Sequence, residues 1–376
     1  MTPQDSWTTR LTEYIANVLP WAHGHQLKGI TTFVDAIIEK QTGNQAELAR
    51  GLGNQEAALK RLSRLLHNPR LAPHRLADAV LVQALRQLPL KGRVRLALDW
   101  TMEGSQHLLV VSLVTGGRAV PIYWRAYDAT VLKGRMRRYE TAVIRRAITR
   151  VQGAIKQRRL LVTADRGFAD VALVEVLTEL GVEFILRVKG STKVYLQGQW
   201  RNLNPLPFAG NTRPRTLGRL AYCESAPQQL WVTLRRARDR QDHGDTWYLI
   251  SNRCRRAHAT AAEYARRFGC EQGFRDAKWE LGFAQARITQ IQAWSRLFAL
   301  FALALLVVVS LAIKLLLPRG PAPVALLRRV ASRRHARWDL SLVSAMVRLL
   351  HEDKSLFAHL SSYMQFNLDA RLIYVS

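Results

Sequence analysis

The spacing of apolar residues changes along the chain from a helical to a strand pattern. Up to about residue 90, apolar positions recur every three or four residues, as in TRLTEYIANVLPWA, which is typical of amphipathic helices. From residue 92 the apolar runs have strand character, beginning with VRLALD, HLLVVSLV and RAVPIYWRAY. A long basic helical pattern at about residues 133–155 then precedes LLVTAD, a further helix and EFILRV. The pattern predicts a helical region followed by an α/β region.

The order of these strands and helices favours one sheet topology. Three strands in succession form an antiparallel meander, and a fourth strand that is reached through a helix can lie parallel to the first. We therefore expect an α/β fold with a ribonuclease-H-like core, which has a mixed five-stranded sheet with helices. Between about residues 189 and 252 the helical signal vanishes and further strand-like segments follow, which predicts an inserted β-subdomain within residues 91–318.

Two helical segments each allow two interpretations. Residues 46–66 contain a helix, a Gly-Leu-Gly turn and a helix with Lys60, Arg61 and Arg64. They form either a helix-turn-helix-like pair that binds DNA or a plain αα-hairpin with a solvated basic face. Residues 297–313 are almost entirely apolar and approach the length of a transmembrane helix. Basic residues flank both of their ends, so no positive-inside asymmetry is present, and we favour a helix buried against the sheet.

The charge of the chain indicates the class of its partner. Lys and Arg number 56 against 28 Asp and Glu, which gives a formal net charge of +28 that is spread along the chain. A broad positive surface favours polyanions, and nucleic acids above all. We therefore expect residues 1–90 to form a helical DNA-binding domain and residues 319–376 to form a basic helical C-terminal region.

Cysteine usage argues against two kinds of stabilising site. Cys223, Cys254 and Cys270 are scattered and lack CxxC spacing, so neither a disulfide framework nor a zinc site is expected. The first residues, MTPQDSWTTRLTEY, lack the basic and apolar regions of a secretory signal. These features predict a protein of the reducing cytoplasm that does not associate with membranes.

Three carboxylates stand where metal ions can be bound. Asp99 follows the apolar run VRLAL and Asp165 follows LLVTA, so each carboxylate emerges at the C-terminal end of a strand. If the two strands are adjacent, the two charges meet at one sheet edge and repel each other unless cations neutralise them. A third carboxylate, Glu271, lies in the helical segment YARRFGCEQGFRDAKWELGF. In so basic a chain, the three carboxylates indicate two-metal chemistry on nucleic-acid phosphates.

The helical segment around Glu271 collects polar groups on one face. Tyr264, Arg267, Glu271 and Lys278 are three, four and seven residues apart, so they share a helical stripe about 60° wide at about 100° per residue. Arg275 falls on the same stripe. A purely structural helix would bury apolar residues on such a face, so this stripe favours a functional site over a solvated ladder of ion pairs.

The spacing from Tyr264 to Lys278 is Y-x2-R-x3-E-x6-K, and two strand-end aspartates and a β-insertion precede it. In these features the chain resembles the YREK-signature DDE transposases of bacterial insertion sequences. The resemblance implies a cut-and-paste DNA transposase in which Asp99, Asp165 and Glu271 bind two Mg²⁺ or Mn²⁺ ions. Carboxylate oxygens are the ligands that these hard cations prefer.

The resemblance also implies partners and DNA contacts. Tyr264, Arg267 and Lys278 would contact phosphates of the transposon end, a role that charge and reach support for the two cations and for the neighbouring Arg275. The partners implied are the inverted-repeat ends and the target DNA, bound by a homodimer in the paired-end complex. The protein would then act in the bacterial cytoplasm and associate with the nucleoid when bound to DNA.

Several further residues near the motifs have more than one possible role. Trp247 stands where relatives offer an aromatic ring to a flipped base, and packing inside the insertion is the alternative. Arg166 directly follows the second aspartate and either contacts DNA at the mouth of the site or is an ordinary surface arginine. For Trp100, Trp124 and Trp279 we expect packing in the core.

Two other functions share this pattern. A structure-specific nuclease would use the same metal site and leave simple nicks. A DNA-binding protein with a catalytically inert transposase-like core would bind the ends without cutting them. The presence of all three carboxylates favours the active transposase.

Overall fold

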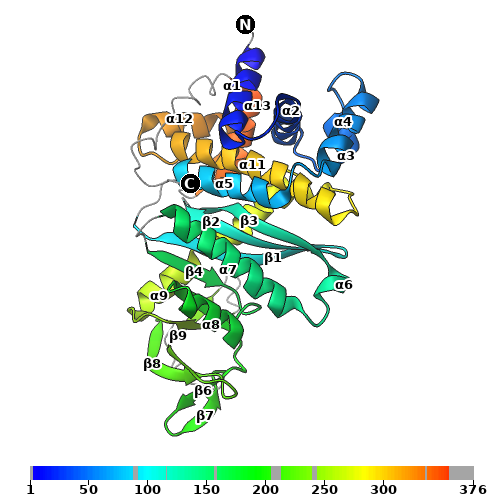
Figure 1. The fold of residues 1–376 in the computed structure, drawn as a ribbon. Helices are drawn as coiled ribbons and strands as arrows, with labels where there is room; N and C mark the ends of the chain where they lie inside the picture. The colour runs from blue at the N-terminus through cyan, green and yellow to red at the C-terminus, as the bar shows by residue number, and fades with distance from the viewer. Residues whose placement is uncertain are drawn as a thin grey trace.

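The computed structural model describes residues 3–87, 92–115, 117–155, 159–204, 213–238, 244–334 and 337–354. The polar run from Asp239 to Asp245 predicts a hairpin loop; its residues 239–243 and the chain after residue 354 lie outside the described residues, whereas Gly244 and Asp245 belong to a strand. Helices form one layer, a mixed sheet lies beneath it, and further strands extend the sheet away from the helices (Figure 1).

The helices predicted in the first 90 residues are confirmed. Two of them begin at an asparagine whose side chain accepts hydrogen bonds from free backbone N–H groups: Asn44 from Ala46 and Glu47, and Asn54 from Ala57. The short helix and the basic helix of the 46–66 segment are therefore separately capped. The helices are α1 (Pro3–Val18), α2 (Gly24–Lys40), α3 (Gln45–Ala49), α4 (Gln55–His67) and α5 (Pro73–Gln87).

The predicted order of strands in the core is also confirmed. The strands lie in the order β3-β2-β1-β4-β5, with β1 antiparallel to β2 and parallel to β4. Helices α7 and α8 follow the meander and the fourth strand, as expected. The elements are β1 (Val94–Glu103), β2 (Gln106–Thr115), β3 (Arg118–Asp128), α6 (Ala129–Leu132), α7 (Met136–Ile155), β4 (Leu160–Ala164), α8 (Val171–Glu179) and β5 (Glu183–Val188).

The inserted strands continue the core sheet, which makes it ten-stranded where five strands were expected. β10 pairs antiparallel with β5, because the apolar strand β5 would otherwise leave its backbone groups unpaired at a sheet edge. KVYLQGQW is a hairpin, since Gln197 and Gly198 both have positive φ, as a tight two-residue turn requires. The strands are β6 (Lys193–Leu196), β7 (Gln199–Asn202), β8 (Arg215–Tyr222), β9 (Gln228–Arg238) and β10 (Gly244–Ser251).

The long apolar helix α11 (Ile291–Leu315) lies in the centre of the protein. Among the described residues it is the one helix long and apolar enough to cross a membrane, and 89% of its apolar window is buried inside the protein. It packs against β3 and against the N-terminal helices α2, α4 and α5 (Figure 1). This placement supports a buried core helix.

The C-terminal helices cover α11 from the other side. The remaining elements are α12 (Pro321–Val330), β11 (Arg333–Arg334), β12 (Arg337–Trp338) and α13 (Leu342–Glu352), and α13 packs on both α11 and α2. Trp124 of β3 meets Phe298 of α11 edge to face at 5.3 Å, which joins the sheet to the helical layer. The residues expected in three separate parts therefore share one hydrophobic core.

Candidate active site

Asp99 and Asp165 lie side by side on two neighbouring strands of the sheet. Asp165 directly follows β4 as expected, whereas the expectation that Asp99 ends its strand was wrong, because β1 continues to Glu103 in its ladder with β2. Leu98 of β1 is in register with Ala164 of β4, so Asp99 and Asp165 occupy the next pair of positions on two parallel strands. Such strands are separated by about 4.8 Å. Each carboxylate is fixed by a local N–H donor: Trp100 N donates to Asp99 Oδ1 at 2.9 Å, and Arg166 N donates to Asp165 Oδ1 at 2.7 Å.

Alternate residues of β1 position the segment that carries Glu271. Successive side chains of a strand point to opposite faces, so Arg95, Ala97 and Asp99 share one face. Arg95 forms a bidentate ion pair with Glu263 at 2.7 and 2.9 Å, and the small side chain of Ala97 packs against Cys270. Two contacts along β1 thus hold the helices α9 (Ala257–Ala265) and α10 (Phe268–Arg275) against the strand face from which Asp99 projects.

Glycines allow α10 to approach β3 closely. A Cβ atom on Gly273 would lie 2.3 Å from the carbonyl oxygen of Ala119, and one on Gly269 would lie 3.4 Å from the carbonyl carbon of Arg118. A larger residue at position 273 cannot fit without moving the helix. The glycines therefore determine how near Glu271 comes to the two aspartates.

We expect Gly273→Ala to push α10 away from β3 and displace Glu271. The clash should lower the free energy of unfolding by about 1–3 kcal/mol. DNA cleavage should fall by about a hundredfold, because a 1 Å misplacement of a reacting group can cost that much. Chemical unfolding and a strand-cleavage assay measure the two effects.

Gly153→Ala is the matched control for this substitution. Gly153 also lies in a helix, α7, and a Cβ atom there meets nothing within 4 Å. Alanine is the better helix former by about 0.5–1 kcal/mol, so this variant should be slightly stabilised and fully active. Equal effects of the two alanines would contradict the role assigned to Gly273.

The three carboxylates act on one another electrostatically. Burial raises the pKa of Asp99 to about 6, and the carboxylates of Glu271 and Asp165 add to this rise. The guanidinium of Arg267 and the N–H of Trp100 oppose it. The strand register places Asp99 beside Asp165, and Glu271 pairs with the buried Arg267, whereas the convergence of all three carboxylates on one metal site stays a prediction.

The positive charge among the carboxylates is the guanidinium of Arg267. Its side chain is 3% exposed and its Nη2 lies 2.7 Å from Glu271 Oε1, while its Nε has no hydrogen-bond partner. Burial lowers the pKa of Arg267, but Tyr264, Asp165 and Glu271 outweigh this effect and hold the pKa above its ordinary value. Arg267 thus supplies part of the charge that carboxylates in this position require.

Tyr264 and Arg187 both contact the carboxylate of Asp165. The hydroxyl of Tyr264 donates to Asp165 Oδ1 at 3.3 Å, and burial raises the pKa of this phenol to about 12, so it stays a donor at neutral pH. Arg187 Nη1 lies 3.9 Å from the same oxygen and also pairs with Asp245 at 2.6 Å. Sequence reasoning missed Arg187, although a cation within the apolar strand EFILRV is a detectable signal.

The residues fit divalent cations in donor type and charge. The described residues contain no group of three His, Cys, Asp or Glu side chains placed to hold a metal ion, and Glu271 pairs with Arg267. The donors are nevertheless hard oxygens, which Mg²⁺ and Mn²⁺ prefer. The raised pKa of Asp99 shows that added positive charge would be favourable here.

The polar stripe predicted on one helix is distributed over three segments. α9 ends at Ala265, α10 begins at Phe268, and residues Asp276–Glu280 form a π-helix. Cys270 N donates to Arg267 O and Leu281 N donates to Asp276 O, so the hydrogen-bond spacing departs from the α-helical one on both sides of Glu271. The rotation of about 100° per residue in a regular α-helix does not hold across such breaks, so it does not place these side chains on one face.

The predicted DNA-contacting residues have different exposures as a consequence. Tyr264 and Arg267 are buried and point towards the carboxylates, whereas Arg275 and Arg166 are exposed and Lys278 is half-buried. Trp279 is 72% exposed, so the expectation that it packs in the core was wrong. It lies in the π-helix, whose wider turn alters the direction that a regular helix would give this side chain.

Trp247 packs inside the protein in this conformation. It is 6% exposed, meets Tyr264 and Phe268 at ring distances of 5.2 and 5.5 Å, and carries Arg235 over its ring at 4.6 Å. This environment favours the packing alternative. Trp247 therefore supports Tyr264, which in turn contacts Asp165.

Comparison with protein families gives a match over residues 136–307 to the transposase DDE domain. These residues, somewhat under half of the chain, are similar to that domain. The matched region runs from the start of α7 into α11 and includes Asp165 and Glu271. A comparison with curated proteins finds no match. The resemblance to insertion-sequence DDE transposases is therefore confirmed, whereas the YREK signature stays a prediction.

Proposed function

We propose that this DDE-domain protein is a transposase that binds the inverted-repeat ends of an insertion sequence, cleaves them and joins them to target DNA. The proposal is carried by the match to the transposase DDE domain, and it is supported by the placement of Asp99 beside Asp165 on parallel strands and by the pairing of Glu271 with the buried Arg267. The family match supports the transposase, and the geometry supports phosphodiester chemistry at these carboxylates.

We assign to Asp99, Asp165 and Glu271 the binding of two Mg²⁺ or Mn²⁺ ions. When bound, such a pair activates water or a DNA 3′-hydroxyl and stabilises the leaving oxygen of an in-line displacement. Tyr264 and Arg187 orient Asp165, and Arg267, which pairs with Glu271 in this structure, would release that carboxylate where Glu271 holds a cation. Arg267 is then free to hold a phosphate oxygen next to the carboxylates.

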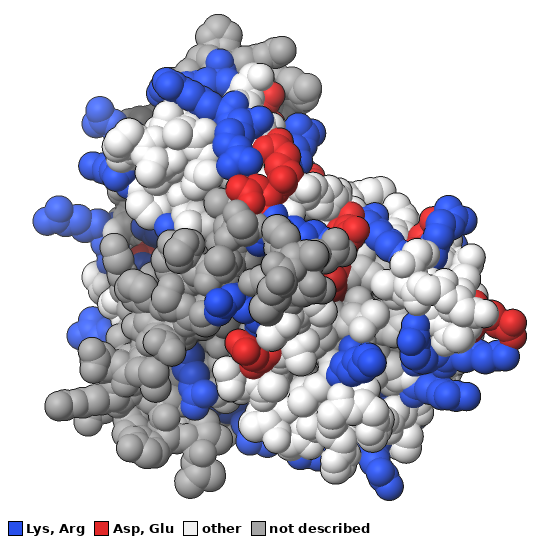
Figure 2. All heavy atoms as spheres, turned by 90° about the horizontal axis from the view of Figure 1, so that it is seen from above, with Lys and Arg blue, Asp and Glu red and all other residues white. Residues whose placement is uncertain are grey.

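Three exposed or half-buried cations around the site bind the remaining DNA phosphates. Lys278 and Arg275 follow Glu271 along the chain and Arg166 follows Asp165, so the DNA strand would cross the sheet edge between them. Among the N-terminal helices the excess of cations lies on α4, with Lys60, Arg61 and Arg64 against Glu56, and on α5, and Figure 2 shows Lys and Arg spread around this end of the molecule. We propose that these helices bind the inverted repeat, that a homodimer pairs the two ends, and that the reaction takes place in the bacterial cytoplasm.

The proposal is tested by incubating the protein with a duplex of the DNA that flanks its gene and with Mg²⁺. A transposase releases the element end and joins its 3′-hydroxyl to a second DNA. A nuclease would leave only nicks, and an inert DNA-binding protein would leave the bound duplex uncut. Nicks alone would contradict the transposase function and favour the nuclease. Bound but uncut duplex would contradict it and favour the inert DNA-binding protein.

A further inference from the structure

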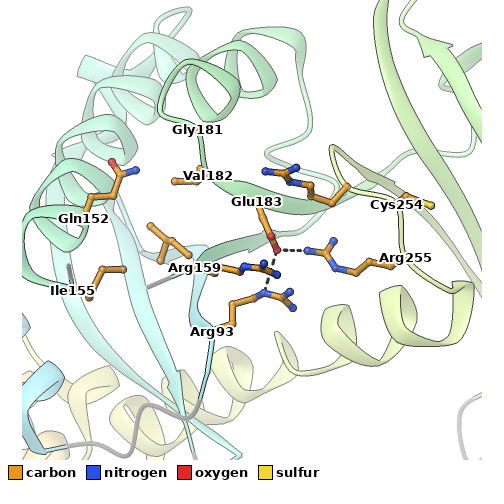
Figure 3. A pocket seen from close by; sticks show the side chains of 11 residues that line it. Arg93, Gln152, Ile155, Arg159, Gly181, Val182, Glu183, Cys254 and Arg255 are labelled. Atoms are coloured by element: carbon orange, nitrogen blue, oxygen red, sulfur yellow. Dashed lines mark hydrogen bonds and ion pairs between the residues drawn. The ribbon is translucent and has the colours of Figure 1, made fainter. Parts of the chain in front are cut away.

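A cavity of about 560 Å³ opens at the N-terminal ends of the parallel strands β1, β4 and β5, away from the end that carries Asp99 and Asp165. The amino ends of β1, β4 and β5 and the segment after β10 line it, with Arg93, Arg159, Glu183 and Arg255 among the lining residues (Figure 3). Arg93 precedes Asp99 by six residues of strand, so the cavity lies about 20 Å from the catalytic edge. It is therefore a separate site.

Positive charge in this cavity exceeds negative charge. Among the described residues four arginines line it, Arg93, Arg159, Arg253 and Arg255, with Glu183 as the one lining carboxylate. Arg93 Nε lies 3.1 Å from Glu183 Oε2 and Arg255 binds the same oxygen, as the dashed lines of Figure 3 show. The side chains of Arg159 and Arg253 have no hydrogen-bond or ion-pair partner in the described part of the chain.

Arg255 provides an independent sign that an anion belongs here. Its side chain is 10% exposed, and its buried Nη1 has no hydrogen-bond partner among the described residues. Burial lowers the pKa of Arg255, and the nearby guanidinium of Arg93 adds to this effect although Glu183 opposes it. Buried guanidinium N–H groups are costly when unpaired, so an added acceptor with negative charge would be stabilising.

A phosphate group meets these requirements best. Guanidinium groups match phosphate oxygens with two parallel hydrogen bonds, and several of them can share one phosphate. Arg93 also lines a second cavity, of about 640 Å³, that continues to Arg266 and Gln272 beside Glu271. Arg93 thus lines both cavities, and the second cavity extends to α10, the helix that carries Glu271.

We propose that the cavity lined by Arg93, Arg159, Arg253 and Arg255 binds a phosphate group, supplied by a DNA phosphodiester that leaves the catalytic edge. The DNA source rests on the proposed transposase function. A free phosphate compound, such as pyrophosphate, is the other source of the same chemistry. In either case Arg159 and Arg253 hold the anion together with the Nη1 group of Arg255, because Glu183 already occupies Arg93 and the Nη2 group of Arg255.

The test uses the full-length protein with Arg159→Ala and Arg253→Ala combined, since neither side chain has a partner whose loss would unfold the protein. Arg328→Ala, an exposed arginine on α12, controls for loss of charge. Fluorescence anisotropy measures binding of a labelled duplex at several salt concentrations, and calorimetry measures binding of sodium pyrophosphate. Thermal melting confirms that the variants are folded.

For a DNA phosphate, the double variant should bind duplex at least tenfold more weakly, and its log–log salt slope should fall by about one or two. For a free phosphate, only pyrophosphate binding should be lost. The proposal is overturned if the double variant matches Arg328→Ala in both assays. If the wild type fails to bind DNA, the transposase function fails, whereas the pyrophosphate measurement still tests the cavity.

Discussion

Replacement of Asp99 by asparagine is expected to abolish DNA strand cleavage while DNA binding is retained. Asparagine keeps the shape of the side chain but removes the charge that holds a cation, and loss of several kcal/mol of transition-state stabilisation slows the reaction by about a thousandfold or more. Asp165→Asn and Glu271→Gln should act in the same way. Gel shifts measure binding, and a labelled transposon-end duplex measures cleavage.

Asp128→Asn is the matched control for these variants. Asp128 ends β3, an outer strand of the same sheet, and its side chain caps α6 by accepting a hydrogen bond from Thr130 N, which asparagine can also do. Cleavage by this variant should equal that of the wild type. Loss of DNA binding in parallel with cleavage in all three active-site variants would mean that the carboxylates maintain the fold and do not bind metal.

The second large effect is expected at Arg267. Arg267→Ala removes the buried cation from among the carboxylates and breaks its 2.7 Å contact with Glu271. Breaking a buried ion pair costs about 3–5 kcal/mol, and because Glu271 is 47% exposed to screening solvent we expect about 2–3 kcal/mol. Denaturant unfolding without divalent cations measures this loss.

Added Mg²⁺ or Mn²⁺ should restore part of the lost stability, since the cation takes the place of the guanidinium charge. Its stabilising effect should be larger in Arg267→Ala than in the wild type. The neighbouring Arg266→Ala is the control, because Arg266 is 59% exposed and lies 3.8 Å from Glu263, a geometry worth less than about 1 kcal/mol. Equal responses of both variants to the cation would contradict the exchange of Arg267 for metal.

The positions of the two aspartates could be predicted because they depend on strand order alone. When the fourth strand lies parallel to the first, Asp165 lies beside Asp99, and this placement does not depend on the conformation of the loops. The long apolar helix could be assigned to the core for a similar reason, since charged residues at both ends of α11 gave no membrane orientation. These features rest on hydrophobic pattern, which a sequence displays directly.

The course of the chain around Glu271 could not be predicted, because it depends on tertiary contacts. Gly273 permits α10 to lie close to the backbone of Ala119 in β3. A turn precedes α10 and a π-helix follows it. The regular 100° spacing therefore misplaced Trp279. Likewise, the pairing of β10 with β5 joins segments about sixty residues apart, and local pattern carries no information about it.

Crystals of the wild-type protein soaked in Mn²⁺ and recorded at its absorption edge would locate the cation directly. We expect anomalous density in contact with carboxylate oxygens of Asp99 and Asp165, and Arg267 turned away from a Glu271 that has become a ligand. If the density at saturating Mn²⁺ instead shows the cation bound elsewhere and Arg267 still paired with Glu271, metal-dependent catalysis at these three residues is contradicted.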